Sequence, residues 1–352
     1  MQNTTVYVGL SGGVDSSVAA LRLKEAGYRV VGAFIKIALP EMPGCTALDD
    51  RISAMRTAAA LEIPFYEVDL TEIYRTRVIE FLTREYAAGR TPNPDVLCNR
   101  DIKFGAFLTW AMEDGADCIA TGHYAQRSDR NGRPHLLQSV DDAKDQTYFL
   151  WQISEEKLSR TLLPIGDMRK DEVRAYAKMH GLHTAKRPDS QGLCFLGAVD
   201  MKDFLKEHLE LSEGDVVTAD GTRIGYHPGI PLFTTGERHG FVITDERYRK
   251  TPLYVLSKDV KHNRLVVGRE FPCAAGGTIR AAETSFIHNA APSDGAYLIR
   301  IRHTGRLIPA TLTFSNGAFT AAFSEEIRGA AAGQSVVVYD RNECLGGGIL
   351  VA

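Results

Sequence analysis

Apolar residues recur with two different spacings along the chain, and the first half combines both. Short apolar runs there predict strands, and amphipathic stretches between them predict helices. The predicted strands are 6–9, 30–37, 63–68 and 118–121, and the predicted helices are 16–26, 71–87 and 101–113. Strands that alternate with helices favour a parallel sheet covered on both faces. In such α/β sheets, ligands bind at the carboxyl ends of the strands.

The second half, beyond about Phe204, changes to short alternating strands separated by Gly and Pro turns. The predicted strands are 253–257, 264–267, 298–302, 310–314 and 335–339. A Gly- and Ala-rich stretch at 271–277 predicts a break that separates a small module from a terminal barrel or sandwich. We therefore expect an α/β domain over residues 1–200, a β-rich central module over 201–270 and a C-terminal β-barrel over 271–352.

Composition and charge are those of an ordinary globular protein. With 352 residues, 44% of them hydrophobic, the chain buries a core without disulfide or metal staples. The net charge of −3 excludes a surface that is positively charged overall, so any contact with RNA is made by a local basic patch. The segment 157–187 holds eight Lys and Arg against three Asp and Glu, which indicates either a solvated helix face or an RNA-facing patch.

Membrane and secretion signals are not apparent in the sequence. The longest apolar run, 30–39, contains Lys36 and is well short of the roughly 20 residues of a membrane helix. The amino terminus lacks a basic, apolar leader, so we expect a cytoplasmic protein without membrane contact. The six cysteines form no CxxC pair, and we expect buried or reactive thiols in place of a disulfide framework or a zinc site.

The first predicted strand-to-helix junction carries a glycine- and serine-rich loop, Gly9-Leu10-Ser11-Gly12-Gly13-Val14-Asp15-Ser16-Ser17. Adjacent glycines let the backbone approach a ligand, and a helix amino terminus offers free N–H groups and the positive end of its dipole. The loop therefore predicts a phosphate site. It has neither the lysine of a Walker loop nor the spacing of a dinucleotide turn.

Two cysteine segments carry the other candidate chemistry. In Thr91-Pro92-Asn93-Pro94-Asp95-Val96-Leu97-Cys98-Asn99, the carboxylate and the thiol are three residues apart, which places them on one side of a helix or turn. In the segment 189–197, Cys194 lies between glycines, near Lys186 and Arg187, whose charges would favour its thiolate. A single free cysteine is more often a buried apolar residue than a nucleophile, so both interpretations stay open for each thiol.

The glycine-rich loop resembles the SGGxDS motif of the PP-loop, or N-type, ATP pyrophosphatases, which hold the pyrophosphate of ATP and transfer AMP to a substrate oxygen. With both cysteine segments, the chain resembles the bacterial tRNA-specific 2-thiouridylase family over nearly its whole length. The similar blocks are 91–104, 120–125, 144–150, 164–167, 189–197 and 344–348. Ile35 departs from the family's usual Met, Gln191 from its usual Thr, and Cys45 has no assigned role.

The resemblance implies a PP-loop domain that acts as a tRNA sulfurtransferase and makes 2-thiouridine at the wobble position. ATP would adenylate the 2-carbonyl oxygen of uridine, so that AMP leaves in its place, and Mg²⁺ would offset the polyphosphate charge without a dedicated protein cage. Cys194 would carry the incoming sulfur as a persulfide. The implied partners are a tRNA with uridine at the wobble position and a cysteine desulfurase or sulfur-relay protein, and we expect a monomer.

The resemblance also implies roles for individual residues. Cys98 would be the nucleophile that closes a transient disulfide with Cys194, and Asp95 the acid/base. The target base would meet Asn93, Pro94 and Asp95. The residues expected to hold ATP are Gly9, Leu10, Ser11, Gly12, Gly13, Val14, Asp15, Ser16, Ile35 and Gly122. Those expected to contact tRNA are His123, Lys144, Asp145, Gln146, Arg302, His303 and Gln334, and we predict no metal ligand.

Two other classes of function compete with this one. An ATP-dependent amide or amidine synthetase acting on a small substrate would need no cysteine, so serine at Cys98 and Cys194 separates it from a thiolase. An RNA-binding or thiol-carrier protein with a degenerate nucleotide loop is disfavoured by the intact Ser-Gly-Gly-Val-Asp-Ser run. The absence of tRNA-stimulated pyrophosphate release would favour that second class.

Overall fold

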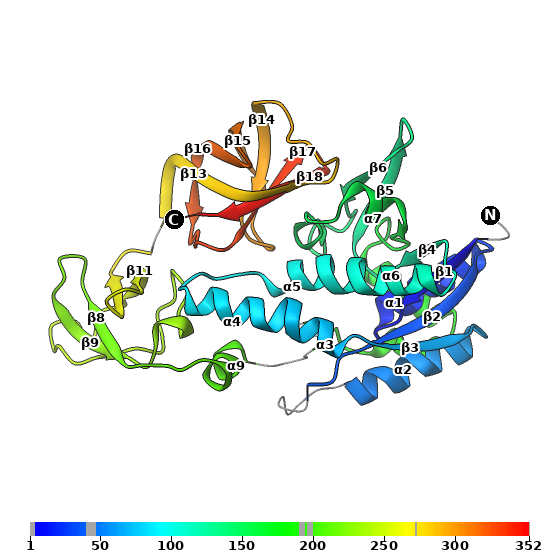
Figure 1. The fold of residues 1–352 in the computed structure, drawn as a ribbon, viewed down its shortest axis with the longest axis horizontal. Helices are drawn as coiled ribbons and strands as arrows, with labels where there is room; N and C mark the ends of the chain where they lie inside the picture. The colour runs from blue at the N-terminus through cyan, green and yellow to red at the C-terminus, as the bar shows by residue number, and fades with distance from the viewer. Residues whose placement is uncertain (1–3, 40–46, 190–193, 196–199, 272, 352) are drawn as a thin grey trace.

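The described part of the chain folds around three sheets (Figure 1). This computed structural model describes residues 4–39, 47–189, 194–195, 200–271 and 273–351. Cys45 and Gln191 lie outside these ranges. Within them, no helix combines the length and the apolarity needed to cross a bilayer.

The first sheet is parallel and confirms the predicted α/β architecture. Its strand order is β3-β2-β1-β4-β7, and every neighbouring pair is parallel. The strands are β1 (Thr5–Gly9), β2 (Arg29–Lys36), β3 (Phe65–Asp69), β4 (Cys118–Ala120) and β7 (Thr161–Leu162). The first four were predicted. The chain runs outward from β1 in both directions, so β1 and β4 flank the point where ligands bind in such sheets.

Helices cover both faces of this sheet. Successive side chains of a strand point to opposite faces, so Val6 and Val8 pack into one apolar cluster and Tyr7 into another. The first cluster involves α1 (Val14–Glu25), α2 (Ala47–Ala60) and α8 (Lys170–Met179). The second involves α3 (Thr71–Tyr74), α4 (Glu80–Ala87), α5 (Pro94–Leu97) and α6 (Phe107–Glu113).

Two π-helical segments interrupt the second helical layer. The segment η1 (Arg75–Ile79) joins α3 to α4, and η2 (Cys98–Ala106) joins α5 to α6. The helix predicted over 101–113 therefore starts earlier, at Pro94, and is wound more loosely in its middle. Because π-helical turns are rare overall but frequent at functional sites, η2 draws attention to the thiol segment.

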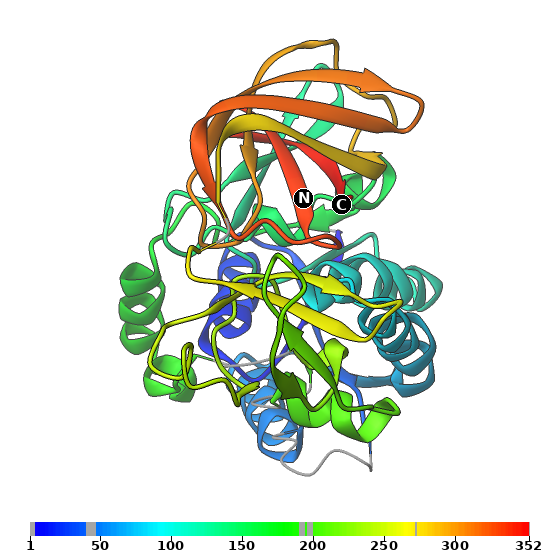
Figure 2. The same ribbon diagram turned by 90° about the vertical axis from the view of Figure 1, so that its left-hand side faces the viewer.

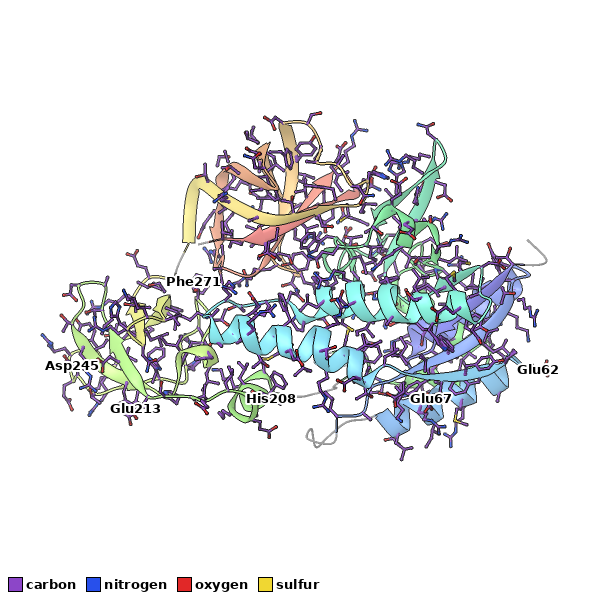
Figure 3. The ribbon with its side chains drawn as sticks, viewed as in Figure 1. Glu62, Glu67, His208, Glu213, Asp245 and Phe271 are labelled. Carbon is purple, nitrogen blue, oxygen red and sulfur yellow. The ribbon has the colours of Figure 1, made fainter. Side chains whose placement is uncertain are left out.

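Shorter helices complete the first two domains. They are α7 (Glu155–Ser159), α9 (Met201–His208) and the 3₁₀ turns η3 (Thr147–Phe149), η4 (His183–Lys186) and η5 (Ile230–Leu232). The central module contains a sheet ordered β10-β9-β8-β12-β11. Its strands are β8 (Gly214–Val217), β9 (Arg223–His227), β10 (Val242–Ile243), β11 (Tyr254–Asp259) and β12 (Arg264–Gly268). Phe271 lies where the chain leaves this module for the last one (Figure 3).

The C-terminal sheet closes into a six-stranded antiparallel barrel, as predicted, because β13 pairs with both β16 and β18. Its strands are β13 (Cys273–Phe286), β14 (Gly295–Arg300), β15 (Ile308–Ser315), β16 (Ala318–Arg328), β17 (Ser335–Asp340) and β18 (Glu343–Leu350). Strand β13 begins at Cys273, so most of the predicted break at 271–277 is strand.

A hairpin from the first domain extends the barrel sheet. The strands β5 (Ala125–Arg130) and β6 (Arg133–Gln138) pair with each other, and β6 pairs with β18. Trp151 Nε1 donates to Ser335 Oγ at 3.0 Å, and Tyr148 donates its hydroxyl to the Ile301 carbonyl at 2.7 Å. All four residues are buried. The barrel therefore sits directly on the first domain, with the central module beside them (Figure 2).

Candidate functional site

The loop between β1 and α1 has the geometry of an anion site. Gly9 ends β1, Leu10 to Gly13 form the loop, and Val14 to Ser16 begin α1. Gly12 has a φ of +77°, and a Cβ there would lie 2.3 Å from the carbonyl oxygen of Asp50. Only glycine fits this position. Gly13 is the N-cap and has no side chain to cap the first-turn amides, which are thus left for an anion.

The serine hydroxyls of the loop hold its shape. The Oγ atoms of Ser11 and Ser16 lie 3.2 Å apart, and Ser17 Oγ donates to the Gly13 carbonyl at 2.8 Å. Ser11 is exposed, whereas Ser16 and Ser17 are buried. Ser11 is therefore the hydroxyl of this loop that a ligand reaches most directly.

The carboxylate of the loop is ion-paired. Lys170 Nζ, at the start of α8, donates to both oxygens of Asp15 at 2.8 Å. The Tyr124 hydroxyl donates to Asp15 Oδ1 at 2.8 Å. Neither Lys170 nor Tyr124 was predicted as a site residue, because they are 155 and 109 residues away in sequence and no local motif marks them.

A second carboxylate, Asp189, gathers cations beside the loop. Lys170 and Lys144 each pair with it at 2.9 Å, and Arg174 pairs with it at 2.6 Å. Burial acts to raise the pKa of Asp189, but the hydrogen bonds from Lys170 and Lys144 outweigh it and hold that pKa well below its usual range. Asp189 and Asp15 together carry less charge than these three cations, so the cluster favours an anionic ligand.

The cations of the basic segment 157–187 do not form a single solvated or RNA-facing surface, because some of them point into the protein. Lys170 and Arg174 turn toward the phosphate loop, and Arg187 donates to the Gly12 carbonyl at 2.8 Å and pairs with Asp50. Arg187 was expected to stabilise the Cys194 thiolate. That expectation is wrong for this structure, because its guanidinium is engaged at the phosphate loop.

The segment Thr121–Tyr124, which follows β4, joins the phosphate loop to the thiols. A Cβ on Gly122 would lie 2.6 Å from the Ser16 nitrogen, so this glycine packs directly on the loop. Tyr124 reaches Asp15, as described, whereas His123 points to the other half of the site. Ile35 lies near the end of the neighbouring strand β2 and is buried.

The thiol segment begins with a capped helix. Asn93 Oδ1 accepts from the amides of Asp95 at 3.0 Å and Val96 at 3.4 Å, and Pro94 occupies the first turn of α5. This cap directs the chain into η2, whose first residue is Cys98. The Asn93 cap therefore sets the start of the helical stretch that carries the carboxylate and the thiol.

Cys98 and Cys194 meet, although they are far apart in sequence. Both are free thiols, and each lies close enough to the other to shift its pKa. Cys98 is 1% exposed and Cys194 half-buried, and the Tyr74 hydroxyl donates to the Cys194 carbonyl at 3.1 Å. The fold thus brings together two thiols that sequence spacing does not connect, and their joint action stays a prediction.

The two thiols are electrostatically unequal. Burial raises the pKa of the Cys98 thiol well above its usual value, and its hydrogen bond to Cys194 adds to the rise. The same hydrogen bond lowers the pKa of Cys194, and the charge of Lys103 lowers it further against the effect of burial. The interaction between the two thiols therefore acts in opposite directions on their pKa values and favours the thiolate at Cys194.

Lys103 is the cation at the thiols. Its Nζ donates to Cys194 Sγ at 3.5 Å and lies 3.4 Å from His123 Nε2. It also lies 5.9 Å from the centroid of the Phe195 ring. The sequence analysis missed Lys103, because a residue five positions after Cys98 would lie on another face of an ordinary α-helix.

The barrel brings the other predicted residues to the edge of the thiol segment. The Thr91 amide donates to the Ala332 carbonyl at 2.9 Å, so a barrel loop rests on the residues before Asn93. The His303 ring lies tilted against Phe149 with 4.3 Å between ring centroids, and burial lowers the pKa of His303. Arg302 donates to the Gly329 carbonyl, and Gln334 Oε1 accepts from the Ala331 amide at 3.1 Å.

Asp145 and Gln146, which were predicted to contact tRNA, instead make contacts within the protein. Asp145 is 1% exposed and pairs with Arg300 at 2.7 Å, with Thr147 Oγ1 donating to the same carboxylate. This burial does not fit direct contact with RNA. Gln146 Oε1 accepts from the Tyr124 amide at 2.9 Å and so positions the phosphate-loop tyrosine.

Comparison with known proteins covers the whole chain. Residues 4–198 match the family model described as the tRNA methyl transferase HUP domain. Residues 202–269 match its PRC-barrel domain, and residues 277–350 match the aminomethyltransferase beta-barrel domain. A solved 4-thiouridine synthetase–RNA complex with bound ATP covers 58% of this chain and 50% of its own, with a TM-score of 0.38 and 18% identity.

The curated relatives are much more similar. The tRNA-specific 2-thiouridylase MnmA of Enterococcus faecalis is 43% identical over 355 residues, which cover 99% of this chain and 95% of the relative. The protein of the same name from Pseudomonas fluorescens is also 43% identical, over 356 residues, with the same coverage of both chains. With its phosphate loop, its paired thiols and this likeness along its full length, the chain belongs to the tRNA-specific 2-thiouridylase family of PP-loop ATP-binding enzymes.

Proposed function

We propose that the protein is an ATP-dependent tRNA-uridine 2-sulfurtransferase that converts the wobble uridine to 2-thiouridine. One observation carries the proposal: the Cys98–Cys194 pair and the phosphate loop are joined through a single segment, Thr121–Tyr124. An amide or amidine synthetase would use the loop but would leave a buried pair of unequal thiols without a task.

The first step is adenylation of the 2-carbonyl oxygen of uridine. The first-turn amides of α1 and Ser11 bind the phosphates of ATP, with Lys170 and Arg187 as cations at the loop. The Ile35 and Gly122 regions bind the rest of the nucleotide. Asp15 and Asp189 are both ion-paired with lysine, so Mg²⁺ is expected to be held mainly by the phosphates and water.

The second step delivers sulfur. The Cys194 thiolate attacks the terminal sulfur of a donor persulfide, the donor's S–S bond breaks, and the donor leaves as a thiolate. The terminal sulfur of the Cys194 persulfide then attacks C2 of the adenylated uridine, and AMP leaves with the oxygen. Asp95 accepts the proton released from sulfur.

The third step frees the product. Cys98 loses its thiol proton, which balances the proton that N3 of the base takes up, and attacks Cys194 Sγ, so that the bond between Sγ and the transferred sulfur breaks. The electron pair stays on that sulfur, which becomes the thiocarbonyl of 2-thiouridine, while Cys98 and Cys194 form a disulfide. A thiol reductant returns the disulfide to two thiols before the next turnover.

The tRNA is expected to contact the barrel edge and the central module. Arg302, His303 and Gln334 lie beside Asn93, where the target base enters. A cavity of about 500 Å³ in the central module is lined by exposed cations, among them Arg238, Arg249 and Lys250. Such cations bind phosphates and position the RNA. The sulfur donor, the monomeric state and the cytoplasmic location stay predictions.

The proposal is tested by incubating the protein with unmodified tRNA, Mg²⁺, cysteine, a cysteine desulfurase and a thiol reductant, with or without ATP. Mass spectrometry of the nucleosides is expected to show 2-thiouridine only with ATP. Because Cys118 lies in β4, away from the thiol pair, Cys118→Ala should keep the activity. Pyrophosphate release without any 2-thiouridine would contradict the proposal and favour a synthetase.

Gly122→Ala is expected to weaken ATP binding. The added Cβ would lie within 3 Å of the Ser16 nitrogen and the Asp15 carbonyl carbon, so the phosphate loop must move. We expect the KM for ATP to rise about tenfold or more, as is typical when a positioning contact is displaced. Gly295→Ala is the matched control, because its Cβ would meet only a tyrosine ring at 3.7 Å. An unchanged KM in Gly122→Ala would contradict the assigned nucleotide site.

A further inference from the structure

Lys103 reaches the thiols because η2 is a π-helix. In an α-helix, residues three and four apart share a face, and residues five apart do not. The i→i+5 hydrogen bonds of η2 bring position 103 back to the side of Cys98, where its Nζ donates to Cys194 Sγ at 3.5 Å. The unusual winding thus places a half-buried cation at the pair of thiols.

His123 holds this lysine in place. An ammonium group has only donors, so at 3.4 Å from Lys103 Nζ the Nε2 atom of His123 acts as the acceptor. The proton of the neutral ring is then on Nδ1, which donates to Thr121 Oγ1 at 2.8 Å. Burial, followed by the charge of Lys103, lowers the pKa of His123 well below its usual value, which keeps the ring neutral.

The charge of Lys103 lowers the pKa of both thiols, but its hydrogen bond reaches only one of the two described sulfurs. Burial opposes its charge, but the nearby Cys194, Cys98 and Asp95 side chains raise the pKa of Lys103. Its Nζ also lies over the Phe195 ring, next to Cys194 in the chain. Of the two sulfurs, only Cys194 accepts a hydrogen bond from Nζ within the part of the chain that the structure describes.

We propose that Lys103, held by neutral His123, is the positioning residue that keeps the negative charge on Cys194 and not on Cys98, and so decides which thiol accepts sulfur. His123 acts through Lys103 and need not contact tRNA, consistent with its 7% exposure. The claim that Cys194 is the thiol that accepts sulfur rests on the proposed function. The claim that Lys103 keeps the negative charge on Cys194 does not.

The placement of charge is tested on the full-length protein by the pH dependence of alkylation. Iodoacetamide reacts with thiolates, and peptide mass spectrometry reports Cys98 and Cys194 separately. Lys103→Met is expected to move the Cys194 profile to higher pH and to lower its rate at pH 7 about tenfold, which corresponds to one pKa unit. Lys103→Arg keeps the charge and should restore most of the rate.

Lys157→Met is the matched control, since Lys157 is also half-buried in this region but donates to the Arg100 carbonyl at 3.1 Å. It should leave the Cys194 profile unchanged. A folded Lys103→Met protein with the parent profile would overturn the inference, as would Lys103→Arg behaving like Lys103→Met. If the profile shifts but the parent protein makes no 2-thiouridine, the proposed function fails and the placement of charge stands.

Discussion

Cys98→Ser is expected to lower single-turnover formation of 2-thiouridine by about a thousandfold or more, as is typical for loss of a reacting nucleophile. The Cys194 persulfide can still attack the adenylated uridine and release AMP. Without the Cys98 sulfur, however, the bond between Cys194 Sγ and the transferred sulfur is not cleaved. We therefore expect a covalent adduct of tRNA and protein to accumulate when no reductant is present.

Cys194→Ser distinguishes the two thiols. It should form neither persulfide nor adduct, because its reacting sulfur is absent. Denaturing gel electrophoresis with labelled tRNA detects the adduct, and addition of dithiothreitol should release 2-thiouridine from the Cys98→Ser adduct only. Full single-turnover activity of Cys98→Ser without reductant would refute its assigned role, and an adduct in Cys194→Ser would refute the assignment of the sulfur carrier.

Asp145→Ala is expected to destabilise the protein by about 3 to 5 kcal/mol, the range for breaking one side of a buried ion pair. The side chains of Asp145 and Arg300 are 0% and 9% exposed, so loss of the carboxylate leaves a buried guanidinium without its partner. The Tm measured by differential scanning fluorimetry should fall by several degrees. Adding Arg300→Met should restore part of that loss, because the isolated charge is then removed.

The same variant decides between two roles for this residue. If Asp145 is structural, the protein that remains folded at low temperature binds tRNA as the parent does. Asp142→Ala is the matched control, because Asp142 is an exposed carboxylate in the same turn and its loss should change the Tm little. An unchanged Tm together with weaker tRNA binding in Asp145→Ala would support the RNA contact that the sequence suggested.

The parallel sheet and the phosphate loop were predictable because local patterns encode them. Alternation of apolar runs and amphipathic stretches located the first four strands, and the glycines of the loop fall directly at a strand-to-helix junction. Helix α2 was missed, since its alanine-rich sequence has little amphipathic contrast. The hairpin β5–β6 was also missed, although Asn131-Gly132 is a strong turn signal and both residues have positive φ.

The sequence predicted the types of residue in the candidate site, but it did not predict which other side chains contact them. Asp95, Cys98 and Cys194 stand in recognisable segments, but contacts across the fold set their charges. Lys103 depends on a π-helix that no residue pattern announces, and Lys170 meets Asp15 across 155 positions. The sequence also does not show that Asp145 is buried under the barrel. Its two neighbours, Lys144 and Gln146, are half-buried at the edge of the site, so the local pattern does not set Asp145 apart from them.

The junction between the barrel and the first domain determines when the enzyme finishes folding. Trp151 hydrogen-bonds Ser335, 184 residues later, and the apolar cluster on one face of the parallel sheet also includes Val337, Tyr339 and Cys344. At about 5 to 20 residues per second, the ribosome releases those partners roughly 10 to 40 s after Trp151. During that interval the β6 edge and the tryptophan lack their cover. The nascent first domain therefore exposes apolar surface until the last strands emerge.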